Sequence, residues 1–237
     1  SSNSRQILLD IILSFLFLSL TYSISNAENL KLPQFKASTG NLFELKFGSI
    51  ESNVILAVVS SSSEKLVIEI HSNVSSSMIP IEMTQQFHLK IKDNKVYISE
   101  GYINVPVLGK ATYRLDSEYL QGYDGVQMAS FLDFKPNSKF KKIADSKVKT
   151  DSGEFEATQY RFKENSQSID FWIAEKIKPF SIAAIRSSGS KKDQNYMLSY
   201  KDNLNSYRSK IDISKAQAMD KKLKAMSRPH SKNVFYF

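Results

Sequence analysis

The sequence predicts an α+β protein with a mainly antiparallel sheet and a few helices, one of them basic and close to the C-terminus. The sheet is predicted because, between residues 42 and 200, apolar and polar side chains alternate in short runs that turn residues separate. The C-terminal helix is predicted because apolar residues there recur every three or four positions.

Residues 1–27 have the pattern of a secretory signal peptide. Arg5 precedes an apolar run over residues 7–20, and small residues precede a cleavage site after Ala27. Asp10 lies inside the apolar run, so a membrane or interfacial anchor and a structural helix of the mature protein remain open. We therefore expect an exported protein, periplasmic or secreted, and self-association through residues 7–20 if this segment is retained.

Composition limits the remaining chain. Of 237 residues, 41% are apolar and 11% aromatic, which is enough for a core. Cysteine is absent, which excludes thiol catalysis and cysteine-ligated metal sites. The formal charge of +8 favours anionic partners, although a soluble lysine-rich surface explains it equally well. After the signal peptide we expect a sheet domain over 28–204, with two sub-sheets dividing near 116–140, and a basic tail over 205–237.

The first half of the predicted sheet follows directly from period-two runs. Strands are expected at 42–47, 66–70, 87–91, 96–99, 102–107 and 111–115. Lys92 to Lys95 has the composition of a tight turn, so the third and fourth of these strands form the clearest hairpin. Pro106 indicates an edge strand or a bulge.

The second half begins after a loop that contains a short helix over 126–132. Strands are expected at 147–150, 154–162, 169–175, 180–186 and 196–201. The connections are short, so successive strands should be neighbours.

The C-terminal helix is expected over residues 214–227 and ends before Pro229. Eight Lys or Arg residues against two Asp between residues 208 and 232 give this segment a charge of about +6. The lysines could contact an anionic membrane or simply face water while the apolar stripe packs on the sheet. The candidate contacts are Lys215, Lys221, Lys222 and Lys224.

No catalytic motif is found in the sequence. It contains no nucleophile elbow, Walker loop or zinc-protease motif. Of its three histidines, His71 and His88 lie in predicted strands, where a structural role is expected. Glu154 and Glu156 share one strand face, which we interpret as solvated. We expect no catalytic residue, no cofactor, no metal and no specific nucleic-acid partner.

Aromatic residues occupy consecutive predicted strands in the C-terminal half. They suit either packing of a core or an apolar pocket that takes an acyl chain. This set contains Tyr160, Phe162, Phe171, Trp172, Phe180, Tyr196 and Tyr200.

Part of this half resembles periplasmic domains of the LolA/LolB-like group and related extracytoplasmic families. The resemblance lies in residues 147–162 (KVKTDSGEFEATQYRF), a strand with Trp172 and Ile173, and Lys178-Pro179 before an apolar strand. It implies a curved half-barrel sheet with helices plugging its concave face, and a role in carrying or sensing lipid or lipoprotein.

These observations together lead to the expectation of a non-enzymatic protein that binds an apolar or anionic ligand, such as a lipid, a lipoprotein or an envelope component. The expected acyl-chain contacts are Phe155, Tyr160, Phe171, Trp172 and Ile182. A secreted bacterial effector that acts through protein–protein interaction is the alternative, and a hydrolase with an unrecognised site is the third.

Overall fold

The computed structural model describes residues 35–75, 80–92, 95–104, 111–116, 140–164, 166–191 and 195–221. Within these ranges nearly every element is a strand. The first six are β1 (Gly40–Phe47), β2 (Ile50–Ser61), β3 (Lys65–Ser75), β4 (Pro80–Lys92), β5 (Lys95–Asn104) and β6 (Thr112–Arg114). The others are β7 (Phe140–Thr150), β8 (Gly153–Glu164), β9 (Gln167–Ile173), β10 (Ile182–Gly189), β11 (Tyr196–Leu204) and β12 (Gln217–Ala218).

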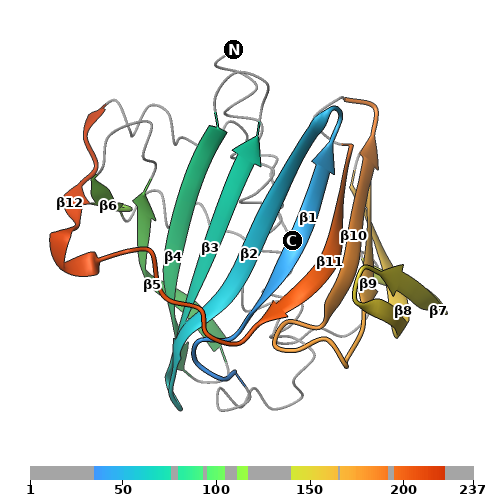
Figure 1. Cartoon of the computed structure of the whole chain (residues 1–237), viewed down its shortest axis with the longest axis horizontal. Helices are drawn as coiled ribbons and strands as arrows, with labels where there is room; N and C mark the ends of the chain where they lie inside the picture. The colour runs from blue at the N-terminus through green and yellow to red at the C-terminus, as the bar shows by residue number, and fades with distance from the viewer. Residues whose placement is uncertain are drawn as a thin grey trace.

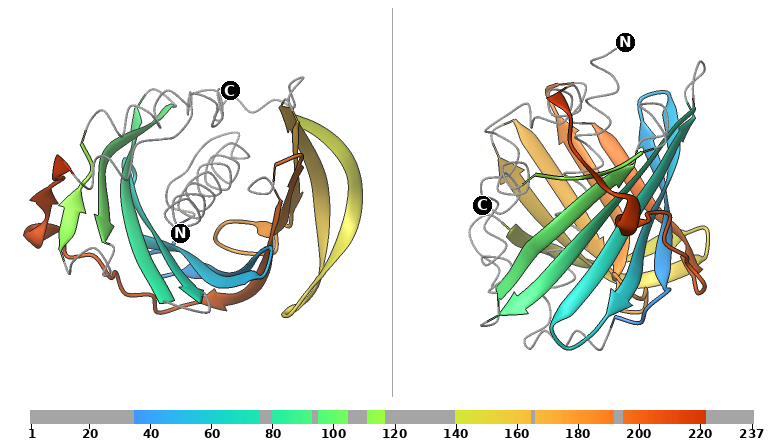
Figure 2. Two further views of the ribbon diagram at one scale, coloured as in Figure 1. Left: turned by 90° about the horizontal axis from the view of Figure 1, so that it is seen from above. Right: turned by 90° about the vertical axis from the view of Figure 1, so that its left-hand side faces the viewer.

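These strands form one sheet in the order β12-β6-β5-β4-β3-β2-β1-β11-β10-β9-β8-β7. Two antiparallel meanders, β1 to β6 and β7 to β11, are joined because β1 pairs with β11 in the middle of the sheet. Figure 1 shows these central strands in front, and Figure 2 shows that the sheet bends into a deep arc. The arc gives the molecule a concave and a convex face.

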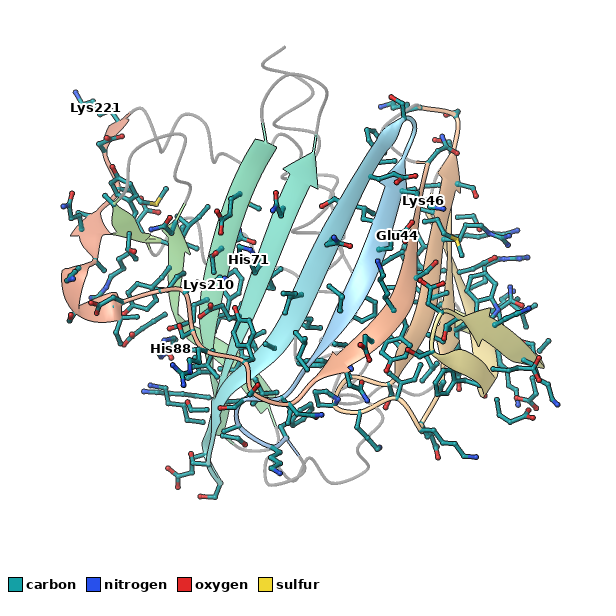
Figure 3. All side chains as sticks on the ribbon, in the orientation of Figure 1. Glu44, Lys46, His71, His88, Lys210 and Lys221 are labelled. Carbon is teal, nitrogen blue, oxygen red and sulfur yellow. The ribbon has the colours of Figure 1, made fainter. Side chains whose placement is uncertain are left out.

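The alternation of side chains decides which residues face the inside of the arc. In β1, Phe43 and Leu45 are buried while Glu44 and Lys46 point outward, and Lys46 forms an exposed ion pair with Glu44 at 3.3 Å. Figure 3 labels this outward pair on the convex side. Cross-strand pairing carries the same division to β2, where Val54 lies opposite Phe43.

The convex face is covered in part by residues 205–216, which we call the C-terminal strap. The strap leaves β11, crosses the outer side of the sheet and reaches β12 beside β6 (Figures 1 and 2). This cover explains why Glu69 and His71 of β3, which face outward, are buried as fully as their inward neighbours.

The structure contradicts the predicted α+β class. In the described ranges the only helical residues are those of the short 3-10 helix η4 (Ile213–Lys215) and Lys221. The predicted helix over 126–132 lies outside the described residues, as do residues 1–34. The antiparallel pairing of β1 to β11 agrees with the predicted mainly antiparallel sheet.

The α-helix predicted over 214–227 is wrong for residues 214–220, and residues 222–227 lie outside the described part of the chain. Asp212 caps a single 3-10 turn, and Ala216 is already extended, with φ −66° and ψ 135°. Gln217 and Ala218 then pair in parallel with Tyr113 and Arg114 of β6. Without β12, β6 would be an edge strand with unpaired backbone N–H and C=O groups. The backbone of residues 217–218 pairs with these groups and so forms a strand instead of a helix.

Most predicted strands overlap an observed strand, but their bounds differ. Residues 102–104 of the strand predicted over 102–107 are the end of β5, β6 is shorter than the predicted 111–115, and residues 174–175 and 180–181 lie outside the strands. The hairpin around residues 92–95 is confirmed by the pairing of Lys92 with Lys95. The turn before β8 is confirmed as well, since Thr150 pairs with Gly153 and Gly153 has a φ of +125°. Sequence analysis did not single out β2, whose run from Val54 to Val59 lacks alternation.

Candidate functional site: the concave face of the sheet

The concave face of β1 to β5 is apolar. Its described side chains are uncharged and nearly all at most 8% exposed. The apolar members are Phe43, Leu45, Phe47, Val54, Leu56, Val58, Leu66, Ile68, Ile70, Met83, Phe87, Leu89, Ile98 and Ile103. A continuous apolar surface of this kind, lining an arc, is suited to an apolar chain.

The connection between β9 and β10 covers one end of this face. Residues 174–181 turn inward, and the Phe180 ring lies 5.9 Å from the Phe35 ring. Asn41 fixes the connection, because its Nδ2 donates to the Lys178 carbonyl at 2.7 Å and its Oδ1 accepts from the Phe180 amide at 3.2 Å. Apart from this connection, no described helix or strand lies inside the arc (Figure 2).

One polar side chain interrupts the apolar surface between β3 and β5. Gln85 of β4 is 0% exposed, and neither its Nε2 nor its Oε1 has a hydrogen-bond partner within the described ranges. Leaving an amide buried without a partner costs about 1–3 kcal/mol. Gln85 is therefore a group that a ligand could satisfy.

The convex face, by contrast, carries a connected polar network. The Glu69 carboxyl accepts hydrogen bonds from Tyr207 Oη at 2.7 Å, Ser209 Oγ at 2.5 Å and the Lys210 amide at 2.7 Å, all from the C-terminal strap. A fourth bond comes from Gln86 Nε2 at 2.9 Å. Burial, together with the neighbouring Glu69, raises the pKa of Tyr207, so its hydroxyl stays a donor. The network attaches the strap to the sheet.

His71 and His88 lie on the same outer face, and His88 joins the Glu69 network through Gln86. His71 Nδ1 lies 2.8 Å from Thr84 Oγ1, and His88 Nε2 lies 2.7 Å from Gln86 Oε1. Burial lowers the pKa of both rings, with Lys210 adding to the effect at His71, and Figure 3 shows Lys210 close to this ring. Both histidines lie in strands, β3 and β4, as predicted.

A second buried charge lies on the outer side of β9. The Asp170 carboxylate accepts two bonds from Arg161, at 2.6 and 3.1 Å, and one from Arg186 at 2.9 Å. Burial opposes its ionisation, but the two guanidinium groups outweigh that effect and hold the pKa of Asp170 below its usual value.

The predicted acyl-chain contacts divide between the two faces. Tyr160 of β8 pairs with Phe171 of β9, which pairs with Ile185 of β10 on the concave face. Ile182 is fully buried opposite Ile173. Trp172 follows Phe171 directly and therefore points to the convex side, where the Arg186 guanidinium lies 5.2 Å from the centre of its ring.

Phe155 is separate from this group. It lies near the start of β8, before the residues from Thr158 to Glu164 that pair with β9. Phe155 packs edge-on against Tyr200 of β11 at 5.7 Å. The hairpin tip reaches the same strand, because Ser152 Oγ donates to the Lys201 carbonyl at 2.5 Å.

The lysines predicted to contact an anionic surface lie near the opposite edge of the sheet. Lys215 is exposed in η4, 3.6 Å from Asp212, and Lys221 is exposed after β12 (Figure 3). Lys222 and Lys224 lie outside the described residues. The Glu154 and Glu156 pair is exposed and shares Lys147 at 3.5 Å each, which confirms a solvated strand face.

The described residues contain neither a metal-binding group of three or more His, Cys, Asp or Glu side chains nor a helix long and apolar enough to span a membrane. Sequence analysis missed Gln85 and Glu69. The alternation of β4 could have indicated Gln85, because it occupies the inward position between Met83 and Phe87.

Comparisons with known proteins give only distant likenesses. No protein-family model matches the chain, and no curated protein matches it. A hypothetical protein from Chlamydia trachomatis is 9% identical, with a TM-score of 0.47 over 81% of this chain and 97% of that one.

Two further solved structures are similar at a lower level. A β-barrel-like protein of Brucella abortus, from a domain family of unknown function (DUF1849), is 8% identical, with a TM-score of 0.35 over 73% of this chain and 98% of that one. A DUF1329 family protein from Desulfovibrio piger is 5% identical, with a TM-score of 0.32 over 82% and 95%. The LolA/LolB-like group is not named among these structures, so that resemblance stays a prediction.

Proposed function

We propose that this protein is an exported binding protein that holds the acyl chain of a lipid or lipoprotein against the concave face of its sheet. The observation that carries this proposal is the uncharged, apolar inner surface that five neighbouring strands present to the inside of one arc. Burial of an acyl chain there removes apolar surface from water at about 25 cal/mol per Å². Tyr160, Phe171 and Ile182 extend the same surface toward β8.

Adjacent residues of β9 provide a matched pair of reporters for this proposal. Trp172 is the only tryptophan of the chain and lies on the convex face, whereas Phe171 lies on the concave face. Exchanging them in the double variant Phe171→Trp, Trp172→Phe moves the fluorophore from one face to the other within one strand. Tyr160→Trp in the Trp172→Phe background is a second concave reporter if the exchange does not fold.

A brominated fatty acid quenches tryptophan fluorescence only at close range, so it reports which face it occupies. We expect saturable quenching of the concave reporter and none of native Trp172. Equal quenching of both faces, or none in either concave variant, would overturn the proposal. Absence of quenching would leave the arc to another occupant, such as the apolar run of residues 7–20.

The basic C-terminal residues add a second part to the proposal, contact with anionic headgroups. Lys215 and Lys221 are exposed at the sheet edge formed by β6 and β12. Each lysine near a charged bilayer contributes about 1 kcal/mol. We expect salt-sensitive binding to vesicles that contain phosphatidylglycerol, lost when Lys215, Lys221, Lys222 and Lys224 are changed to Gln. Binding that is unchanged in this variant would refute this part.

A further inference from the structure

Two adjacent glutamines of β4 differ in the hydrogen bonding of their side-chain amides. Gln86 points outward and uses its polar atoms: Nε2 donates to Glu69 and to Ser209 Oγ at 3.1 Å, and Oε1 contacts His88. Gln85 points inward, and both of its amide atoms lack a partner in the described part of the chain. The amide of Gln86 therefore has hydrogen-bond partners on the convex face, whereas the amide of Gln85 has none among the described residues on the concave face.

The direct neighbours of Gln85 along and across the strands are apolar, and Ser72 of β3, opposite Met83, is a further buried polar side chain on this face. Ile70 lies opposite on β3 and Ile103 opposite on β5. Met83 and Phe87 flank it along β4, and these four side chains are at most 3% exposed. A ligand that enters this surface therefore meets one amide within an otherwise apolar ring.

The side chains around Gln85 limit which polar group a ligand can place beside its amide. A carboxylate buried there would have no cation beside it, since the described concave side chains of β1 to β5 carry no charge. A neutral carbonyl needs only a donor, and Gln85 Nε2 supplies two N–H groups. An ester carbonyl at the head of an acyl chain meets both requirements, since its chain covers the apolar neighbours.

We propose that Gln85 donates a hydrogen bond to the ester carbonyl of the bound acyl group and so fixes the depth at which the chain lies in the arc. This inference rests on the proposed function and names the ligand class, a neutral acyl ester. Free fatty acid in its ionised form would then bind without this bond, with its charged head outside the ring.

The test compares methyl oleate, oleate at pH 8 and 1-octadecene by competition against the brominated fatty acid. Gln85→Met keeps the unbranched shape of the side chain and removes the amide. We expect this variant to lose about five- to tenfold affinity for methyl oleate, the loss of one hydrogen bond, while its affinity for 1-octadecene and oleate is unchanged. An equal change for all three ligands would overturn the inference.

A second measurement does not depend on the variant. Methyl oleate labelled with ¹³C at the carbonyl should show a resonance shifted downfield from its position in hydrocarbon solvent when it is bound to the wild-type protein. A bound resonance at the hydrocarbon position would overturn the role of Gln85 even if Gln85→Met failed to fold. Failure of the proposed function has a different signature, because no ligand would bind the wild-type protein.

Discussion

Replacing Glu69 with Ala should release the C-terminal strap from the convex face of the sheet. Glu69 is 0% exposed and accepts four hydrogen bonds, three of which come from Tyr207, Ser209 and Lys210 of the strap. The substitution removes all four at once and leaves the Gln86 and Tyr207 donors buried without this partner. At about 0.5–1.5 kcal/mol for each bond, with the cost of stranded donors included, we expect a loss of about 3–5 kcal/mol of unfolding free energy.

Urea denaturation measures this loss, and limited trypsin digestion locates it. Arg208 and Lys210 are trypsin sites within the strap, so cleavage there should be faster in Glu69→Ala than in the wild-type protein. Glu44→Ala is the matched control, because Glu44 faces the same side and its ion pair within the described ranges is with exposed Lys46. We expect the control to change stability by less than about 0.5 kcal/mol.

Two results would refute this reasoning. A loss of under about 1 kcal/mol in Glu69→Ala would show that the four bonds do not hold the strap. A large loss without faster cleavage in the strap would place the effect inside the sheet. Glu69→Gln should fall between the wild-type protein and Glu69→Ala, because a carboxamide keeps one acceptor oxygen but turns its amide toward donors.

The remaining predictions concern single residues of the sheet. Gln85→Met should raise the unfolding free energy of the unliganded protein by about 1–3 kcal/mol because it removes an unsatisfied amide, and a lower urea midpoint would contradict this. Asp170→Asn should cost about 3 kcal/mol near neutral pH. The folded-state pKa of Asp170 is lowered, so its contribution to stability is present above the ordinary carboxyl pKa of about 3.9 and is lost as the pH falls through the lowered value. The unfolding free energies of variant and wild type should therefore converge toward about pH 2. A difference that stays constant with pH would exclude this cause. Trp172→Ala should cost about 1–2 kcal/mol, below the 3–5 kcal/mol of a fully buried ring, since Trp172 is only partly buried; native emission at the wavelength of a fully buried ring would contradict this. Gly40→Ala should cost about 1–3 kcal/mol in thermal or urea unfolding, because its Cβ would lie 2.7 Å from the Leu56 carbonyl oxygen, and an unchanged midpoint would show that β2 can move aside.

Much of the strand content could be predicted from the sequence, because side-chain alternation is a local property. The run Phe43, Glu44, Leu45, Lys46 already defines which face of β1 is buried, and the same pattern holds in β4. The LolA-like half-barrel expectation agrees with the curved single sheet in shape (Figure 2), while the helices expected to accompany it are not found among the described residues.

The C-terminal segment shows where local pattern fails. The spacing of Ala216, Met219 and the residues that follow favours a helix, yet the described part forms η4 and then β12. The reason is a partner distant in sequence: β6 presents a free edge, and Met219 is 7% exposed once the strap has crossed the sheet. A helical period in a short segment does not reveal such a partner.

Site residues were harder to predict than strands, for the same reason. The sequence by itself determined the alternating strands, the hairpin turns, the absence of cysteine chemistry and the basic C-terminal region, because each depends on neighbouring residues or on composition. Only the tertiary structure decided that β1 pairs with β11, that Glu69 holds the strap, and that Trp172 and Phe171 face opposite sides. It also decided that Gln85 is buried and has no hydrogen-bond partner among the described residues. Those facts depend on residues brought together from distant parts of the chain, where burial and hydrogen bonding are set by packing and not by local pattern.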